Sequence, residues 1–88
     1  MDRKEHIGKM FGKNLKHLRS SRGQSQVEFA EEIKLSDKKL SKLELGQNHP
    51  SFTTLIKLHR KFGFKVDPII QEICENLGPY EAEFDDEE

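Results

Sequence analysis

Residues 25–46 read SQVEFAEEIKLSDKKLSKLELG, and this stretch decides the fold. Residues 25–28 have the Ser-x-x-Glu form of a capping box, which predicts that a helix begins there. Ser36 followed by Asp37 predicts the start of the next helix, because serine is a good cap and an acid in the first turn favours the helix dipole. Only residues 34–36 connect the two helices, so the stretch predicts a sharp crossing rather than an antiparallel hairpin.

Helical periodicity of apolar residues continues on both sides of this stretch. The preceding helix is expected to end near Gly23, because a glycine in the left-handed conformation can cap its C-terminus there. The following helix is capped by Ser51 and stops at Gly63. A last helix opens at Asp67-Pro68, a cap followed by proline at the first helical position. The pattern predicts an all-α fold of five short helices around one core. The apolar residues of these helices are Ile7, Met10, Phe11, Leu15, Leu18, Phe29, Ala30, Ile33, Leu40, Leu43, Leu55, Leu58, Phe62, Ile69, Ile70, Ile73 and Leu77.

The composition fits one small intracellular domain. The chain has 88 residues, of which 33% are hydrophobic and 35% charged, and no tryptophan. Its single cysteine, Cys74, excludes an internal disulfide framework and fits a reducing compartment. We expect Cys74 to be a small buried residue of the last helix. No apolar run is long enough for a membrane span and residues 1–6 form no secretory signal, so a cytoplasmic location is expected.

Positive and negative charges are segregated along the chain. Residues 81–88 hold six acids and no base, whereas the other 80 residues carry 15 bases against 10 acids. We therefore expect a folded domain over residues 1–79 and an acidic, disordered tail over residues 80–88. A basic body suits a protein that binds a polyanion such as DNA.

A set of spaced residues follows one known pattern. They are Leu15-Lys16-His17-Leu18-Arg19, Ser25-Gln26-Val27-Glu28-Phe29-Ala30, Ser36, Leu40-Ser41-Lys42-Leu43-Glu44-Leu45-Gly46, Pro50, Leu55, Leu58, Phe62 and Gly63. Through these residues the run from Leu15 to Val66 resembles the Cro/repressor class of helix-turn-helix domains, the XRE family typified by lambdoid phage repressors. The resemblance implies a five-helix, lambda-repressor-like DNA-binding domain with the helix-turn-helix at helices 2 and 3.

The third helix is then the expected reading helix. At about 100° per residue, Leu40 and its inward neighbours lie on one side of this helix, and Lys38, Ser41 and Lys42 lie on the other. The resemblance implies base contacts at Asp37 and at these three outward residues, and lysine can donate to guanine O6 and N7 in the major groove. The candidate base-reading residues are therefore Asp37, Lys38, Ser41 and Lys42. The alternative interpretation is that all four are ordinary solvated residues of a surface helix.

The sequence departs from the family at the turn before this helix. Where relatives usually have glycine the chain has Lys34, which must either accept a left-handed backbone at about 1 kcal/mol or change the turn. The reading helix is also rich in lysine, where many relatives use glutamine or asparagine.

Phosphate contacts are expected at helix starts, where backbone amides and side-chain donors point outward. Both the residues and the family pattern place these contacts at the start of the second helix and in the loop before the fourth. The candidates at these two places are Gln26, Gln47, Asn48, Ser51 and Thr53. Lys39, on the third helix, is a further candidate that either contacts a phosphate or is a solvated charge. The resemblance further implies that Arg19 and Glu44 form an internal structural ion pair rather than contact DNA.

Catalysis and metal binding find no support in the sequence. The four histidines and the cysteine show no zinc spacing, and no nucleophile arrangement, acid/base pair or phosphate-cradling glycine loop is present. We expect neither an enzyme nor a cofactor.

Two functions remain. The first is a homodimeric transcription repressor of a double-stranded DNA operator, because one reading helix makes too few contacts for tight binding. Its interface is predicted on the apolar residues of the fifth helix, Ile69, Ile70, Ile73 and Leu77, which could instead all be core. The second is an antitoxin or adaptor that binds a protein partner, such as a toxin, and regulates its own operon. Tyr80 and Phe84, interleaved with carboxylates, suit a tail that folds onto a basic partner.

Overall fold

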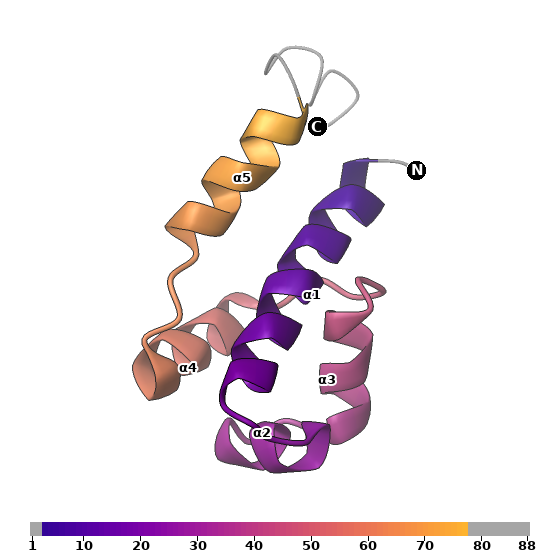
Figure 1. The fold of residues 1–88 in the computed structure, drawn as a ribbon. Coiled ribbons are helices and arrows are strands. Elements are labelled where there is room, and N and C mark those ends of the chain that lie inside the picture. Colours follow the sequence, from indigo (N-terminus) through magenta and orange to yellow (C-terminus); the bar gives the residue numbers. More distant parts are fainter. Residues whose placement is uncertain (1–2, 78–88) are drawn as a thin grey trace.

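The computed structural model describes residues 3–77, which form five helices and no strand (Figure 1). The helices are α1 (Arg3–Ser21), α2 (Gln26–Glu32), α3 (Asp37–Glu44), α4 (Phe52–Phe62) and α5 (Asp67–Leu77). The prediction of an all-α, five-helix fold is confirmed. Residues 80–88, the predicted acidic tail, lie outside the described residues. Among residues 3–77, no helix combines the length and apolar character that a membrane span requires.

Most helix ends lie where the local sequence predicted them. The Ser25 hydroxyl accepts a hydrogen bond from the Glu28 N–H at 3.1 Å, and the Glu28 carboxylate accepts one from the Ser25 N–H at 2.9 Å. This is a complete capping box. Ser36 and Ser51 each accept a hydrogen bond from the backbone N–H three residues further on, at 3.0 and 3.1 Å. Gly63 ends α4 with a left-handed φ of 68°.

The start of α5 differs from the prediction by one residue. The sequence placed Asp67 as the cap and Pro68 at the first helical position, but the helix begins at Asp67 itself. The Ile70 N–H donates to the Val66 carbonyl at 2.9 Å, so Val66 opens the helix. Pro68 still lies in the first turn, where backbone N–H groups have no partner within the helix and the missing donor costs nothing.

The core lies where α1, α2, α3 and α4 meet. Leu15, Phe29, Leu40 and Leu58, one from each of these helices, have no exposed surface. Two aromatic contacts extend this core. The Phe29 ring stacks on that of Phe62 at 4.7 Å between centroids, and Phe11 meets Phe64 edge-on at 5.9 Å. Phe64, which lies between α4 and α5, is a core residue that the helical pattern missed.

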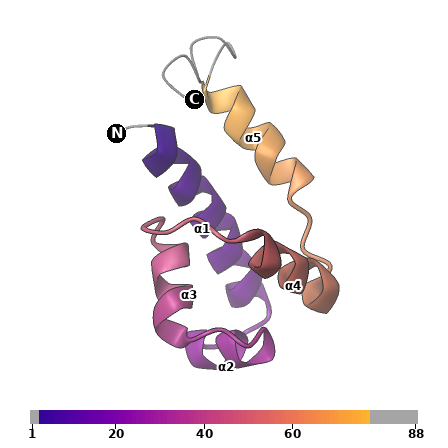
Figure 2. The same cartoon turned by 180° about the vertical axis from the view of Figure 1, so that it is seen from behind.

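α1 and the end of α3 approach so closely that only glycine fits between them. A Cβ on Gly12 would lie 2.4 Å from the Leu43 carbonyl oxygen and 2.5 Å from that of Glu44. A Cβ on Gly8, one helical turn earlier, would lie 2.8 Å from the Gly46 carbonyl oxygen. From behind, α3 and α4 flank α1 while α2 crosses the base of the molecule (Figure 2). The glycines therefore set how deeply α3 seats on α1.

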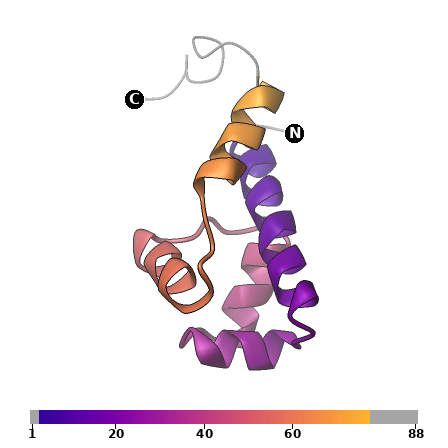
Figure 3. The ribbon, with the colours of Figure 1, turned by 60° about the vertical axis from the view of Figure 1, so that its left-hand side comes forward.

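α5 runs beside the N-terminal part of α1, above α4 (Figure 3). Ile69 and Ile73, four residues apart, are buried at 5% and 8% exposure. The next residue, Cys74, is exposed, which corrects the expectation that it is buried. The reason is helical geometry, because one residue turns the side chain by about 100° away from the buried stripe.

Candidate nucleic-acid interface

α3 turns most of its polar residues outward, whereas its two leucines and Glu44 at its end are buried. Asp37, Lys38 and Lys42 are exposed, and Ser41 is half-buried. Within residues 3–77, none of these four side chains makes a hydrogen bond or an ion pair. The four residues predicted to read bases thus share one face, and their donors and acceptors are not engaged elsewhere in the described part of the chain.

The turn between α2 and α3 accommodates a lysine in a glycine-type conformation. Lys34 has a φ of 56°, and no other non-glycine residue in the described chain has a positive φ. The Leu35 N–H donates to the Ala30 carbonyl at 2.9 Å, which closes the turn back onto α2. Of the two alternatives for this position, the chain takes the left-handed backbone and keeps the turn. This conformation costs an L-residue about 1–2 kcal/mol.

A nearly buried ion pair fixes α3 to the rest of the molecule. Glu44 accepts from Arg19 Nε at 2.7 Å and from Arg19 Nη2 at 3.0 Å, a bidentate pair whose side chains are 3% and 14% exposed, respectively. The hydrogen bonding of Arg19 to the Glu44 carboxylate, which accepts, raises the pKa of the guanidinium above its ordinary value. Arg19 Nη1 also donates to the Gln24 carbonyl at 2.9 Å. The end of α1, the segment before α2 and the end of α3 are therefore held together.

Gln26 belongs to the same network. Its Nε2 donates to Glu44 Oε1 at 3.0 Å, so the side chain is half-buried and directed at the end of α3. As the first residue of α2, Gln26 also places its backbone N–H at the helix start. The side chain can therefore donate to a phosphate only with its remaining Nε2 N–H, which the sequence alone did not indicate.

The loop between α3 and α4 forms a shallow cleft against α3. Lys39, Asn48 and Ser51 line this cleft of about 300 Å³, so the fold brings three predicted phosphate contacts together. His49 lines it as well, and its Nε2 lies 2.9 Å from the Lys4 carbonyl oxygen. The sequence pattern indicates no DNA-binding role for His49. Its place directly after Asn48 in the loop was the one available signal for an interface role.

Two further candidates lie outside this cleft. Gln47 and Thr53 are both exposed. The Gln47 N–H donates to the Lys42 carbonyl at 2.9 Å, so its backbone donor closes the end of α3. Thr53 lies in the first turn of α4, where free backbone N–H groups also occur.

The residues predicted to form a dimer interface divide between core and surface. Ile69 and Ile73 are buried within the single chain and have almost no surface left for a partner. Leu77 is half-buried and packs against the core, whereas Ile70 is 51% exposed. The apolar stripe of α5 is mainly a core stripe, because α1 covers it.

Residues 3–77 contain no group of three His, Cys, Asp or Glu side chains placed to hold a metal ion.

Comparison with known proteins agrees with this geometry. A family model described as a helix-turn-helix domain matches residues 12–75. The chain is 34% identical over 62 residues to the SPbeta prophage-derived uncharacterized HTH-type transcriptional regulator YonR of Bacillus subtilis (strain 168). That match covers 70% of this chain and 57% of the relative. No solved structure matches the chain. Because the family model spans most of the chain and includes α2, α3 and their turn, the chain belongs to the helix-turn-helix domain family, in the Cro/repressor class that its sequence resembles.

Proposed function

We propose that the chain is a sequence-specific transcriptional regulator that reads the major groove of double-stranded DNA with α3. One observation carries the proposal: α3 presents Lys38, Ser41 and Lys42 on one outward face, with no partner in residues 3–77. A helix fits the major groove, and lysine donors match the acceptors of guanine there. The similar Bacillus subtilis protein is named as an HTH-type transcriptional regulator, which supports the same interpretation.

The test begins with selection of bound sites from a random duplex pool. Lys38→Ala and Lys42→Ala should each lose about 1–3 kcal/mol of affinity for the selected site and relax the preference at one base pair. Lys16→Ala is the matched control, because Lys16 is an exposed lysine of α1. If both α3 variants keep the affinity and preference of the wild type, α3 is not the reader.

We propose that phosphate groups are contacted at two places, the cleft between α3 and the loop that follows it, and the start of α2. Lys39 and Asn48, with Ser51, provide donors around one cleft, and Gln26 provides them at the start of α2. Lys39→Ala should weaken binding to all sequences alike and reduce the salt slope of log K by about one, as expected for one lost phosphate contact. If this variant instead changes which DNA sequence is preferred, Lys39 contacts a base rather than a phosphate.

The regulator is proposed to act as a homodimeric repressor. One eight-residue reading helix spans few base pairs, and two copies would read half-sites about one helical turn apart. Selected sites should therefore be palindromic and bind two copies. A site without symmetry, bound by one copy, would contradict dimeric reading but leave the role of α3 intact.

A second candidate is an antitoxin or adaptor that also binds its own operator. The acidic segment 81–88, which lies outside the described residues, favours it through its six carboxylates. A neighbouring gene whose product co-purifies with the full chain, but not with a chain lacking residues 81–88, would support this function. A product that co-purifies with neither chain would argue against it.

A further inference from the structure

Four basic residues gather at a surface outside α3. A shallow hollow of about 300 Å³ lies where the end of α2 meets α4, and Figure 3 shows α4 above one end of α2. The hollow is lined by Lys34, which follows α2, and by Lys57, Arg60 and Lys61 of α4. We call these four residues the basic patch.

The amino-acid sequence has an excess of positive charge here. Residues 51–65 contain four lysine or arginine residues, three of them in the basic patch, and no acid. Among the described residues, Glu32 is the one acid that lines the hollow. Its carboxylate lies 3.7 Å from Arg22 Nη2 and accepts a hydrogen bond from the Gln24 side chain, so it is already engaged within the chain. The basic patch therefore keeps a net positive charge.

Nothing in the described part of the chain neutralises the basic patch. Among residues 3–77, none of its four side chains makes a hydrogen bond or an ion pair. Arg60 and Lys61 lie in the last turn of α4, where bases favour the helix dipole, but Lys57 lies before that turn. Four like charges at one hollow repel one another, and a bound anion would relieve this repulsion.

We infer that the basic patch binds the phosphate groups of duplex DNA without regard to base sequence. This inference rests on the DNA binding proposed above and adds a second contact surface to that of α3. Lysine and arginine side chains that contact phosphates release counterions and supply affinity, but they carry no information about the sequence.

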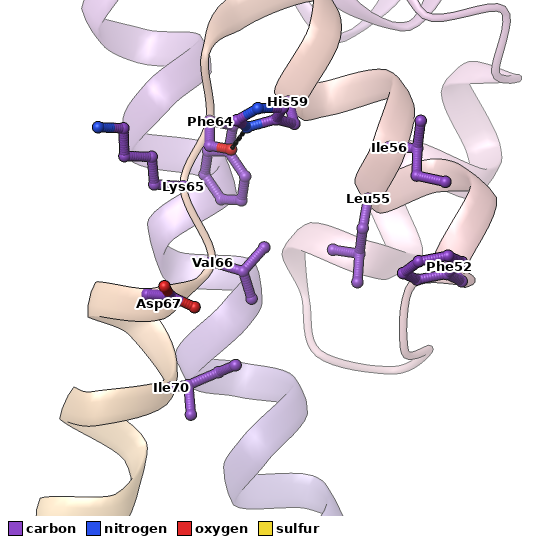
Figure 4. Close-up of a pocket in the computed structure, with 9 residues that line it drawn as sticks. All are labelled: Phe52, Leu55, Ile56, His59, Phe64, Lys65, Val66, Asp67 and Ile70. Atoms are coloured by element: carbon purple, nitrogen blue, oxygen red, sulfur yellow. Dashed lines mark hydrogen bonds between the residues drawn. The ribbon is translucent and has the colours of Figure 1, made fainter.

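The hollow lacks the apolar anchors that an acidic protein partner would use. Protein interfaces are depleted of lysine at their centre, and aromatic residues with arginine supply most of their binding energy. None of the large hydrophobic residues exposed in the described chain lines this hollow, and its one apolar residue, Ile33, is 2% exposed. Phe52, Ile56 and Ile70 instead line a separate hollow between α4 and α5 (Figure 4). A surface that offers charge alone suits a phosphate backbone.

The basic patch and α3 can contact DNA at the same time. The two helices α3 and α4 flank α1 (Figure 2), and no residue of α3 lines the hollow. Lys34, however, lies only two residues before Ser36, the cap of α3. The phosphates can therefore come from the flanking part of the duplex that α3 reads or from a second duplex, and both sources present the same chemistry.

Binding of the full chain to a non-selected duplex, measured by fluorescence anisotropy over a salt series, tests the inference. The double variant Arg60→Gln/Lys61→Gln removes two charges and keeps good helix formers. The slope of log K against log salt should fall by about 1.8 for two lost phosphate contacts, and the dissociation constant should rise at least about tenfold at low salt.

Lys13→Gln/Lys16→Gln is the matched control, because it removes the same two charges from exposed residues of α1. Its dissociation constant should change less than about threefold, with the salt slope of the wild type. All four substituted side chains are exposed, so far-ultraviolet circular dichroism should stay unchanged for both variants. If the patch variant and the control bind alike across the salt series, the inference is overturned.

Two further measurements identify the source of the phosphates. If they flank the selected site, extending that site by about ten base pairs on each side should strengthen binding of the wild type but not of the patch variant. If they belong to a second duplex, the wild type should carry a labelled selected site onto beads that bear a non-selected duplex, and the patch variant should not. A wild type that shows neither effect overturns the inference.

The same variants separate this inference from the proposed function. If the patch variant binds every duplex more weakly but selects the same sequence as the wild type, the patch binds phosphate and α3 still reads bases. If no sequence is selected but the salt slope depends on the patch, the inference stands and the proposed function fails. If Lys38→Ala loses sequence preference while the patch variant matches its control, the proposed function stands and the inference fails.

Discussion

Substituting Gly12 by alanine should change the stability of the fold in two opposite ways. The higher helix propensity of alanine should raise it, and the packing of the added Cβ should lower it. Gly12 lies within α1, where alanine is favoured over glycine by about 1 kcal/mol. On propensity alone the variant should be more stable. The added Cβ would, however, lie 2.4 Å from the Leu43 carbonyl oxygen and 2.5 Å from that of Glu44. Both neighbours are backbone atoms and cannot rotate away.

The expected magnitude follows from this overlap. An ordinary contact of a Cβ begins near 3.4 Å, so α1 and the end of α3 would have to separate by about 1 Å. Overpacking of this kind costs about 1–3 kcal/mol, and the backbone contacts place Gly12 at the upper end. When the gain in helix propensity is subtracted from this cost, we expect the free energy of unfolding to fall by about 2 kcal/mol. For a domain of this size that loss lowers Tm by about 8–16 °C.

Thermal unfolding followed by circular dichroism at 222 nm, the helical band, measures the effect. Ser20→Ala is the matched control, because Ser20 is an exposed residue of the same helix. Its stability should change by less than about 0.5 kcal/mol. The DNA affinity of Gly12→Ala should also fall, since α3 seats on α1 through this contact. A Tm above that of the wild type would show that α1 and α3 are not in tight contact and would refute the reasoning.

Three other perturbations have defined outcomes. Glu44→Ala leaves the nearly buried Arg19 guanidinium without its carboxylate partner, so the free energy of unfolding measured in urea should fall by about 3–5 kcal/mol. A decrease below about 1 kcal/mol would mean that the ion pair is solvated. Lys34→Gly removes a left-handed penalty of about 1–2 kcal/mol at an entropic cost of about 0.5–1 kcal/mol, so stability should rise by up to about 1.5 kcal/mol. Lys34→Val should destabilise instead, and equal stability of the two variants would contradict the turn geometry. Deleting residues 81–88 should raise non-specific DNA affinity several-fold at low salt, with the gain fading as salt rises; equal affinities across a salt series would exclude competition between tail and DNA.

The sequence by itself determined the five helices and most of their ends. Ser25, Ser36 and Gly63 act through contacts with residues at most five positions away, so the chain near each of them already contains both partners. The spacing of apolar residues likewise separated the outward polar face of α3 from its buried leucines. The positions expected to read DNA then followed from the resemblance to the Cro/repressor class, which assigns base contacts to this outward face.

Only the tertiary structure decided which surfaces are covered. Gly12 and Phe64 carry no distinguishing pattern in the sequence, yet one sets the approach of α3 to α1 and the other completes the core. Ile69 and Ile70 are adjacent isoleucines of one helix, but the first is buried in the core and the second is 51% exposed. The engagement of Gln26 by Glu44, 18 residues away, is of the same kind. Such contacts depend on how separate helices cross, and periodicity within one helix carries no information about the element that packs against it.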